Sequence, residues 1–278
     1  MTLHSSAVLV VAHPGHELRL HGWLEQARPH VLVLTDGSGR NESSRIAAAS
    51  AYLATLDLPP GPLFGRYTDR VIYDALLKQD LRLFIALADE LAAFFVCACV
   101  DFVVGDATEG YNTTHDVCRL VLDAAVAMAG RARGRALVSY DFPVVRRPDD
   151  CPADLRAQAV WLNLPDEVFA RKLAAARRHY PELLAEVESA LAHASDGPLR
   201  AFLELNDQFG SANGHGPLDQ FRIECLRPTR AADAAAPTPR PFYELHSERL
   251  VAAGHYQQVI RYHEHIRPLA LALAAHAG

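Results

Sequence analysis

The chain has 278 residues, of which 50% are hydrophobic and 22% are charged, so it can bury one large core or one core with an appendage. Its formal net charge of -6 gives no broad cationic surface, which argues against a nucleic acid or an anionic membrane as the partner. Its 5 cysteines are scattered, and charges interrupt its longest apolar stretch, so we expect a cytoplasmic protein with reduced thiols and no membrane span.

The first predicted element is a strand over residues 7–11, because Ala-Val-Leu-Val-Val is short and apolar on successive residues. This pattern is typical of a parallel sheet that is covered on both faces. The strand runs into Ala-His-Pro-Gly-His-Glu, where proline and glycine break it before an amphipathic helix. His13 and His16 therefore lie in a turn at the carboxyl edge of the sheet, where open α/β folds bind their ligands.

The same alternation of apolar runs and helical periods continues through the first half of the chain. It predicts an α/β fold with a mostly parallel, doubly wound, Rossmann-like sheet and helices on both faces. The predicted strands are residues 31–35, 63–67, 101–105 and 135–141, and the predicted helices are residues 41–56, 74–95 and 114–128.

The pattern changes after residue 141. A proline-rich loop is followed by predicted helices, by an Ala/Pro-rich segment that we expect to be mobile, and by a closing segment that bears histidines and glutamates. We expect residues 1–278 to form one domain, in which residues 1–141 are the core that carries the site and residues 142–278 are helical and loop additions. The elements expected in these additions are helices over 165–193 and 198–206, the mobile segment 231–241 and the closing segment 242–275.

Further polar residues follow two other predicted strands. Asp36 and a glycine come directly after the strand over 31–35, and Asp106 ends the strand over 101–105. A polar loop then leads to His115 at the start of the next helix. Neither glycine pattern typical of dinucleotide or phosphate-binding loops is present. Because the carboxyl ends of parallel strands meet at one sheet edge, we expect these residues to line the same cleft as the first two histidines.

Three of these features, in this order, resemble the LmbE/PIG-L family of zinc-dependent N-acetylglucosaminyl deacetylases. The family has Ala-His-Pro-Asp-Asp-Glu after its first strand, commonly Thr-Asp-Gly after its second, and a later His-Pro-Asp-His motif that opens a helix. This chain has Ala-His-Pro-Gly-His-Glu, Thr-Asp-Gly and, nine residues after Asp106, His115 at a helix start. The resemblance covers about residues 8–141 and implies an LmbE-like fold, a bound zinc ion and a sugar-containing small-molecule substrate.

The resemblance assigns a metal-binding role to three histidines. His13 matches the first metal histidine of the family and His115 the last, while His16 stands where the family has an aspartate ligand. Three imidazoles are a suitable zinc set, since nitrogen ligands bind at about 2.0–2.1 Å and three protein ligands leave an open position. With only neutral ligands the ion would keep its full charge and make a bound water more acidic.

Two positions depart from the family pattern. Gly15 stands where the family has its general-base aspartate, and we expect its Cα to face the space beside the metal. Asn112 replaces the first histidine of the later motif, and its amide remains able to donate a hydrogen bond to an oxyanion. A base must then come from another carboxylate, and the sequence does not rank the nearby ones, which are Glu17, Asp36, Asp106 and Glu109.

Several of these residues also have a purely structural interpretation. Glu17, a catalytic candidate together with Asp106 and Asn112, could simply hold its turn by accepting hydrogen bonds from backbone amides. Arg45, a candidate for substrate binding together with Glu109, could instead form a salt bridge in the first turn of its helix.

The leading hypothesis is a metal-dependent hydrolase that removes an acyl group, most simply N-acetyl, from a sugar-containing or similarly polar small molecule. The alternatives are a catalytically inactive carbohydrate-binding protein of the same fold and a metal enzyme with a different reaction. The sequence leaves the substrate and the oligomeric state open, and a homo-oligomer is compatible with it.

Overall fold

The structure is a computed structural model, and it describes residues 6–39, 43–208, 216–230 and 240–278. In these residues a 7-stranded sheet has the order β3-β2-β1-β4-β5-β7-β6. Strands β1 to β5 are parallel, whereas β7 is antiparallel to both β5 and β6. The predicted α/β fold is confirmed. The strands are β1 (Ala7–Val11), β2 (His30–Thr35), β3 (Pro60–Tyr67), β4 (Phe102–Asp106), β5 (Val138–Phe142), β6 (Val160–Asn163) and β7 (Ile223–Pro228).

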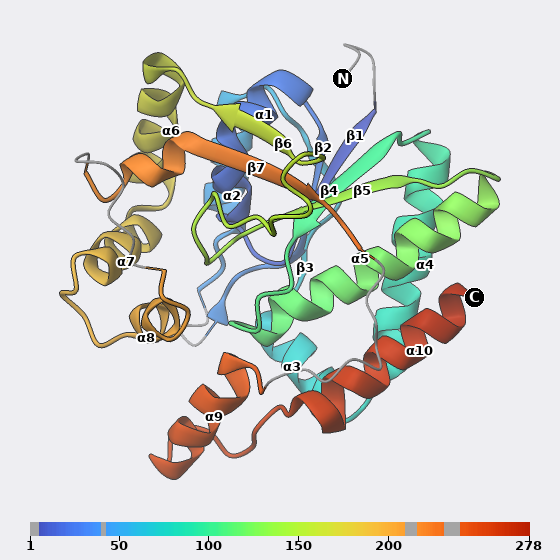
Figure 1. Cartoon of the computed structure of the whole chain (residues 1–278). Coiled ribbons are helices and arrows are strands. Elements are labelled where there is room, and N and C mark those ends of the chain that lie inside the picture. The colour runs from blue at the N-terminus through green and yellow to red at the C-terminus, as the bar shows by residue number, and fades with distance from the viewer. Residues whose placement is uncertain (1–5, 40–42, 209–215, 231–239) are drawn as a thin grey trace.

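The central strand β1 is buried on both faces, as its unbroken apolar run predicts. Successive side chains point to opposite faces, so Val8 and Val10 belong to one hydrophobic cluster and Leu9 and Val11 to the other. The first cluster is completed by α3 (Asp69–Leu77), α4 (Leu81–Cys97), α5 (Thr113–Ala132) and α10 (Arg267–Ala277). The second is completed by the short 3-10 helix η1 (His16–Leu20), α1 (His21–Ala27) and α2 (Ile46–Thr55), and Figure 1 shows the two helical layers on either side of the sheet.

Two of the long helices predicted from periodicity are each divided into two. The helix expected over residues 74–95 is α3 followed by α4, with Gln79 between them at a φ of 52°. The helix expected over 165–193 is α6 (Asp166–His179) followed by α7 (Pro181–Leu191). Tyr180 leaves the helical conformation there, because the ring of Pro181 lacks an amide donor and restricts the residue before it.

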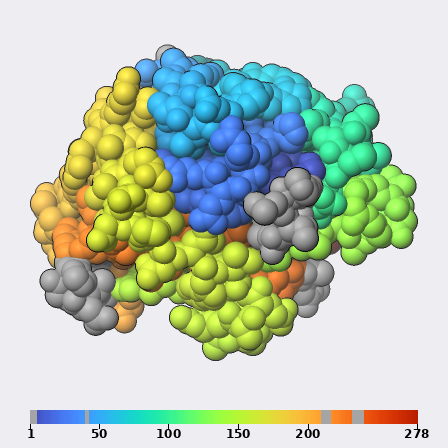
Figure 2. All heavy atoms as spheres, turned by 90° about the horizontal axis from the view of Figure 1, so that it is seen from above, coloured from blue at the N-terminus to red at the C-terminus, as the bar shows by residue number. Residues whose placement is uncertain are grey.

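The C-terminal half also contributes β6 and β7, which were not predicted; residues 142–278 were expected to add only helices and loops. Strand β7 carries Glu224, a charged residue that is unusual in a buried strand. Its carboxylate accepts hydrogen bonds from the backbone amides of Gly22 and Trp23 at 2.9 Å each and from Lys172 Nζ at 2.9 Å. These bonds hold α1 and α6 against β7. Figure 2 shows the residues around α6 packed directly on the N-terminal third of the chain.

The remaining elements are α8 (Pro198–Leu205), the short 3-10 helix η3 (Asp219–Arg222), α9 (Phe242–Ala252) and a π-helical turn, η4 (Tyr262–Ile266), that leads into α10. Most of the segment expected to be mobile, 231–241, lies outside the described residues. None of the described helices is long and apolar enough to cross a membrane.

Candidate active site

The three histidines predicted as metal ligands lie side by side. His13 follows β1, His16 begins η1, and His115 is the third residue of α5, whose cap is Asn112. The ring centroids are 5.3 Å apart for His13 and His16, 5.1 Å for His13 and His115, and 4.5 Å for His16 and His115. All three line one cavity of about 530 Å³ at the carboxyl ends of β1, β2 and β4. This size is within the range of small-molecule sites.

Two of the rings are held from behind by oxygen acceptors. His16 Nδ1 lies 2.8 Å from Asp106 Oδ2, which also accepts a hydrogen bond from the Ala12 amide at 2.8 Å. His13 Nδ1 lies 2.7 Å from Thr35 Oγ1 and 3.1 Å from Asp69 Oδ1. An ionised carboxylate can only accept, so the Nδ1 that faces it carries the proton and Nε2 keeps its lone pair. Carboxylate-histidine pairs of this kind orient the ligands of metal sites.

Burial favours neutral imidazoles at His16 and His115. Burial is the largest cause that lowers the pKa of His16 and of His115 well below the usual range, and the neighbouring histidines lower it further. Burial raises the pKa of Asp106 to about 6. For Asp69, burial opposes ionisation, but hydrogen bonds to His13, Thr35 and the backbone outweigh it and hold the pKa of the carboxyl well below its usual range. Neutral rings are the form that can donate a lone pair to a metal ion.

These residues fit a zinc ion by their chemistry, but their donor atoms are not gathered for it. In the ranges that the structure describes, no group of three or more His, Cys, Asp or Glu side chains could hold a metal ion as it stands. His115 Nδ1 is buried without a hydrogen-bond partner among the described residues. The expected meeting of the three side chains at one point within bonding reach would therefore require the adjacent rings to turn, and metal binding remains a proposal.

The surroundings of Gly15 differ from the sequence-based expectation. Its Cα was expected to face the space beside the metal, where a base could stand. A Cβ built there would lie 2.6 Å from Leu183 Cδ1 and 3.6 Å from the Tyr180 ring, and the residue has a φ of 106°. Gly15 does line the cavity beside the histidines, but α7, which the sequence did not connect with this turn, packs against it. A side chain at this position would be both crowded and strained.

Glu17 and Asp36 hold their turns. The carboxylate of Glu17 is fully buried and accepts hydrogen bonds from the Gly15 amide at 2.7 Å and from the Tyr180 hydroxyl. Burial raises the pKa of Glu17. Asp36 Oδ1 accepts a hydrogen bond from the Ser38 amide at 3.0 Å. Neither carboxylate is part of the described cavity wall, so the structural interpretation accounts for both.

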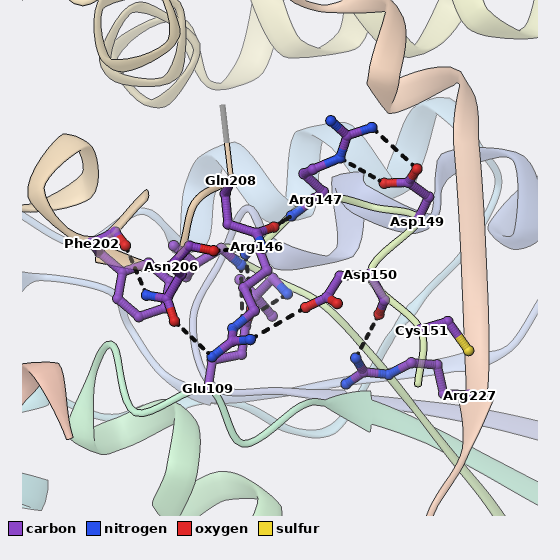
Figure 3. A network of polar contacts seen from close by, with 12 residues as sticks. Glu109, Arg146, Arg147, Asp149, Asp150, Cys151, Phe202, Asn206, Gln208 and Arg227 are labelled. Carbon is purple, nitrogen blue, oxygen red and sulfur yellow. Dashed lines mark hydrogen bonds and ion pairs between the residues drawn. The ribbon is translucent and has the colours of Figure 1, made fainter. Parts of the chain in front are cut away.

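Glu109 was expected to contact the substrate, but it lies behind the cavity wall. Its two oxygens accept hydrogen bonds from the amides of Val144, Val145 and Arg146 at 2.8–2.9 Å. The loop after β5 thus closes over Glu109, and Figure 3 shows that Asn206 and Gln208 hold the same loop from the end of α8. The carboxylate fixes the loop that forms one wall of the cavity. The sequence could not show this, because the bonded partners are 35–37 residues away.

Arg45 and Asn112 do reach the cavity. Arg45 precedes α2, and its guanidinium packs against Gly37, with Nε buried and unpaired among the described residues. Asn112 Oδ1 accepts a hydrogen bond from the Thr114 amide at 2.8 Å, which caps α5, and the side chain also contacts Tyr73.

The polar residues of the cavity wall that were not predicted from the sequence include Asp69 and Tyr73 on α3 and Glu186 on α7. Burial raises the pKa of Tyr73 to about 12. Burial also raises the pKa of Glu186, while the charge of Arg45 lowers it. The sequence did carry a signal for the start of α3: Thr68, directly before Asp69, is a residue type typical of helix N-caps. Its hydroxyl caps α3 by accepting a hydrogen bond from the Val71 amide.

Comparisons with known proteins were made on sequence and on structure. No protein-family profile matches the chain, and no curated protein matches it in sequence. Among solved structures, the A40926 pseudoaglycone deacetylase is 19% identical over 81% of this chain and 96% of its own, with a TM-score of 0.50. A deacetylase of teicoplanin biosynthesis is 15% identical over 82% of this chain and 100% of its own, with a TM-score of 0.49. The first similarity establishes a shared fold. The site must be interpreted from its own residues.

Proposed function

We propose that the protein is a metal-dependent hydrolase that removes an acyl group, most simply N-acetyl, from the amino sugar of a glycoconjugate. The observation that carries the proposal is the group of three adjacent imidazoles, with ring centroids 4.5–5.3 Å apart, in a cavity at the carboxyl edge of a parallel sheet. The sequence resemblance to the LmbE/PIG-L deacetylases and the fold shared with a pseudoaglycone deacetylase support it.

His13, His16 and His115 would hold the metal through the nitrogens not used for other contacts. When bound, zinc supplies a Lewis acid for the acyl carbonyl and an acidified water as the nucleophile. Asp106 holds His16 in the tautomer that leaves its Nε2 lone pair free, so it is a positioning residue rather than a general base. Asp106 also supplies a negative charge next to the His16 ring. The family instead has an anion, its aspartate, as a direct metal ligand.

Other residues of the wall would position the substrate. Asn112 lines the cavity, and its side-chain amide would donate a hydrogen bond to the carbonyl oxygen as negative charge develops on it. Arg45 brings five N–H donors to the same cavity and suits sugar hydroxyls or an anionic group. Asp69 and Glu186 are the carboxylates of the cavity wall itself.

A second candidate, a carbohydrate-binding protein without turnover, is favoured by one observation. Gly15 provides no carboxylate where the family has its base, and Leu183 covers that position. General-base catalysis is typically worth about 10²–10⁴-fold. Without a replacement base, the same cavity would bind its ligand and turn it over slowly or not at all.

Metal content and turnover together distinguish these functions. The purified protein should hold close to one equivalent of zinc, and the zinc-loaded protein should release acetate from glycosides of N-acetylglucosamine. His16→Ala should abolish both. His30→Ala is the matched control, since His30 is exposed at the start of β2, on the opposite sheet edge, and should change neither.

Zinc binding and sugar binding without acetate release would support the non-catalytic alternative. Failure of the wild-type protein to bind zinc would refute the metal-dependent proposal.

A further inference from the structure

The proposed hydrolysis needs a general base, which must reach the attacking water directly or through one further water molecule. Among the described residues, two carboxylates line the cavity, those of Asp69 and Glu186. Asp69 is already engaged on both oxygens. Its Oδ2 accepts a hydrogen bond from the Gly39 amide at 2.7 Å, and its Oδ1 lies 3.1 Å from His13 Nδ1. Glu186 is the carboxylate that remains for proton transfer.

Glu186 belongs to the same helix that covers Gly15. Leu183 of α7 fills the space beside Gly15, with its Cδ1 2.6 Å from the position of an added Cβ. Glu186 follows three residues later on α7. Helical residues three apart are neighbours on the helix surface, with Cβ atoms about 5–6 Å apart. The helix that closes the position of the family's base therefore brings a different carboxylate to the cavity, about one turn further along.

The charges that act on Glu186 come from residues beside the histidines. Partial burial raises the pKa of Glu186, and the charge of Arg45 lowers it. Burial lowers the pKa of His16, and the charge of Arg45 lowers it further. Burial also raises the pKa of Tyr111, and the charge of Glu186 raises it further. The Tyr111 ring lies 6.2 Å from the His115 ring. Glu186 is therefore within electrostatic reach of two residues that each lie near a predicted metal ligand.

Glu186 also has the properties of a proton acceptor. Among the described residues, none donates a hydrogen bond to its carboxylate, so its lone pairs are not used to hold the fold. The residue stays partly exposed to solvent. Its raised pKa brings it closer to the neutral range in which a base is most effective, and the positive charge of Arg45 favours its ionised form.

We infer that Glu186 is the general base of the hydrolysis. The inference rests on the proposed function and adds a catalytic residue to it. The Glu186 carboxylate accepts one proton from the attacking water as the water oxygen bonds to the acyl carbon. The same proton then passes from Glu186 to the sugar nitrogen as the bond between the acyl carbon and that nitrogen breaks. The products are the carboxylic acid and the free amine, and Glu186 is again ionised.

Glu186→Gln in the zinc-loaded, full-length protein tests this role. With the methyl glycoside of N-acetylglucosamine as substrate, kcat should fall about 10²–10⁴-fold. The zinc content and KM should not change, because glutamine has the shape of glutamate but does not accept the proton. Glu188→Gln is the matched control, since Glu188 is an exposed residue of the same helix outside the described cavity wall, and it should change none of these quantities.

Three further readouts separate a base from a structural residue. Wild-type kcat/KM should fall as the pH drops through the pKa of Glu186, because only the ionised carboxylate accepts a proton, and Glu186→Gln should lose this dependence. Glu186→Asp should keep the dependence and part of the rate. Added formate should accelerate Glu186→Ala by replacing the missing carboxylate, and it should not accelerate Glu188→Ala.

Each remaining outcome has a definite meaning. A Glu186→Gln variant as active as the wild type would overturn the inference and leave the proposed hydrolysis standing. Loss of zinc or a raised KM in this variant, without rescue of Glu186→Ala by formate, would assign Glu186 a structural or binding role and would also overturn the inference. A zinc-loaded wild type that releases no acetate would refute the proposed function, and the inference with it.

Discussion

The packing of α7 against Gly15 was not expected from the sequence. The variant Gly15→Ala tests it through the free energy of unfolding. Two costs add. A non-glycine residue at positive φ costs roughly 1–2 kcal/mol, and forcing a methyl group to within 2.6 Å of Leu183 Cδ1 adds an overpacking cost of about 1–3 kcal/mol. We expect Gly15→Ala to lower the free energy of unfolding by about 2–5 kcal/mol. The assay is urea denaturation followed by circular dichroism.

Gly134→Ala is the matched control, because Gly134 has a φ of 65° but a Cβ added there would have no described atom within 4 Å. It should show the backbone cost of about 1–2 kcal/mol alone. In a Leu183→Ala background the cost of Gly15→Ala should fall by the overpacking part, which gives a coupling of about 1–3 kcal/mol between the two sites. If Gly15→Ala costs no more than Gly134→Ala and shows no coupling, the turn faces open space and our account of α7 is refuted.

Three further predictions concern buried charges and the metal. Lys172→Met should lower the free energy of unfolding by about 3–5 kcal/mol by leaving Glu224 unpaired, whereas Arg171→Ala, which removes an exposed ion pair, should cost less than about 1 kcal/mol. Burial lowers the pKa of Lys172, so between this pKa and 10.5 the unfolded chain holds a proton that the native state has lost. The free energy of unfolding of the wild type should therefore rise relative to that of Lys172→Met as the pH is raised toward 10.5. Parallel pH profiles of the two proteins would contradict this. Glu109→Gln should cost about 1–3 kcal/mol and speed amide exchange in the loop at 144–146, and unchanged exchange there would reject the loop-holding role. Zinc at about 100 times its dissociation constant should stabilise the wild type by about 2.7 kcal/mol, a gain that a chelator and His115→Ala should both remove; equal stabilisation of the variant would place the ion elsewhere.

The sequence by itself determined the first half of the sheet and the positions of the histidines along it. The run from Ala7 to Val11 is buried on both faces, and a strand of that kind needs no information beyond its own apolar residues. Because parallel strands bring their carboxyl ends to one edge, the placement of His13, His16 and His115 after strands was enough to predict that they lie together.

What surrounds those histidines was decided only by tertiary structure. Strand β7 escaped prediction because Glu224 interrupts its apolar pattern, and its charge is explained only by the amides and the lysine that converge on it from α1 and α6. Glu109 binds a loop 35–37 residues away, and Leu183 closes the space at Gly15 from 168 residues further along the chain. Local periodicity reports which face of a segment is buried; it carries no information about which distant segment buries it. For that reason the sequence predicted that the three histidines lie together, and only the fold built the cavity around them.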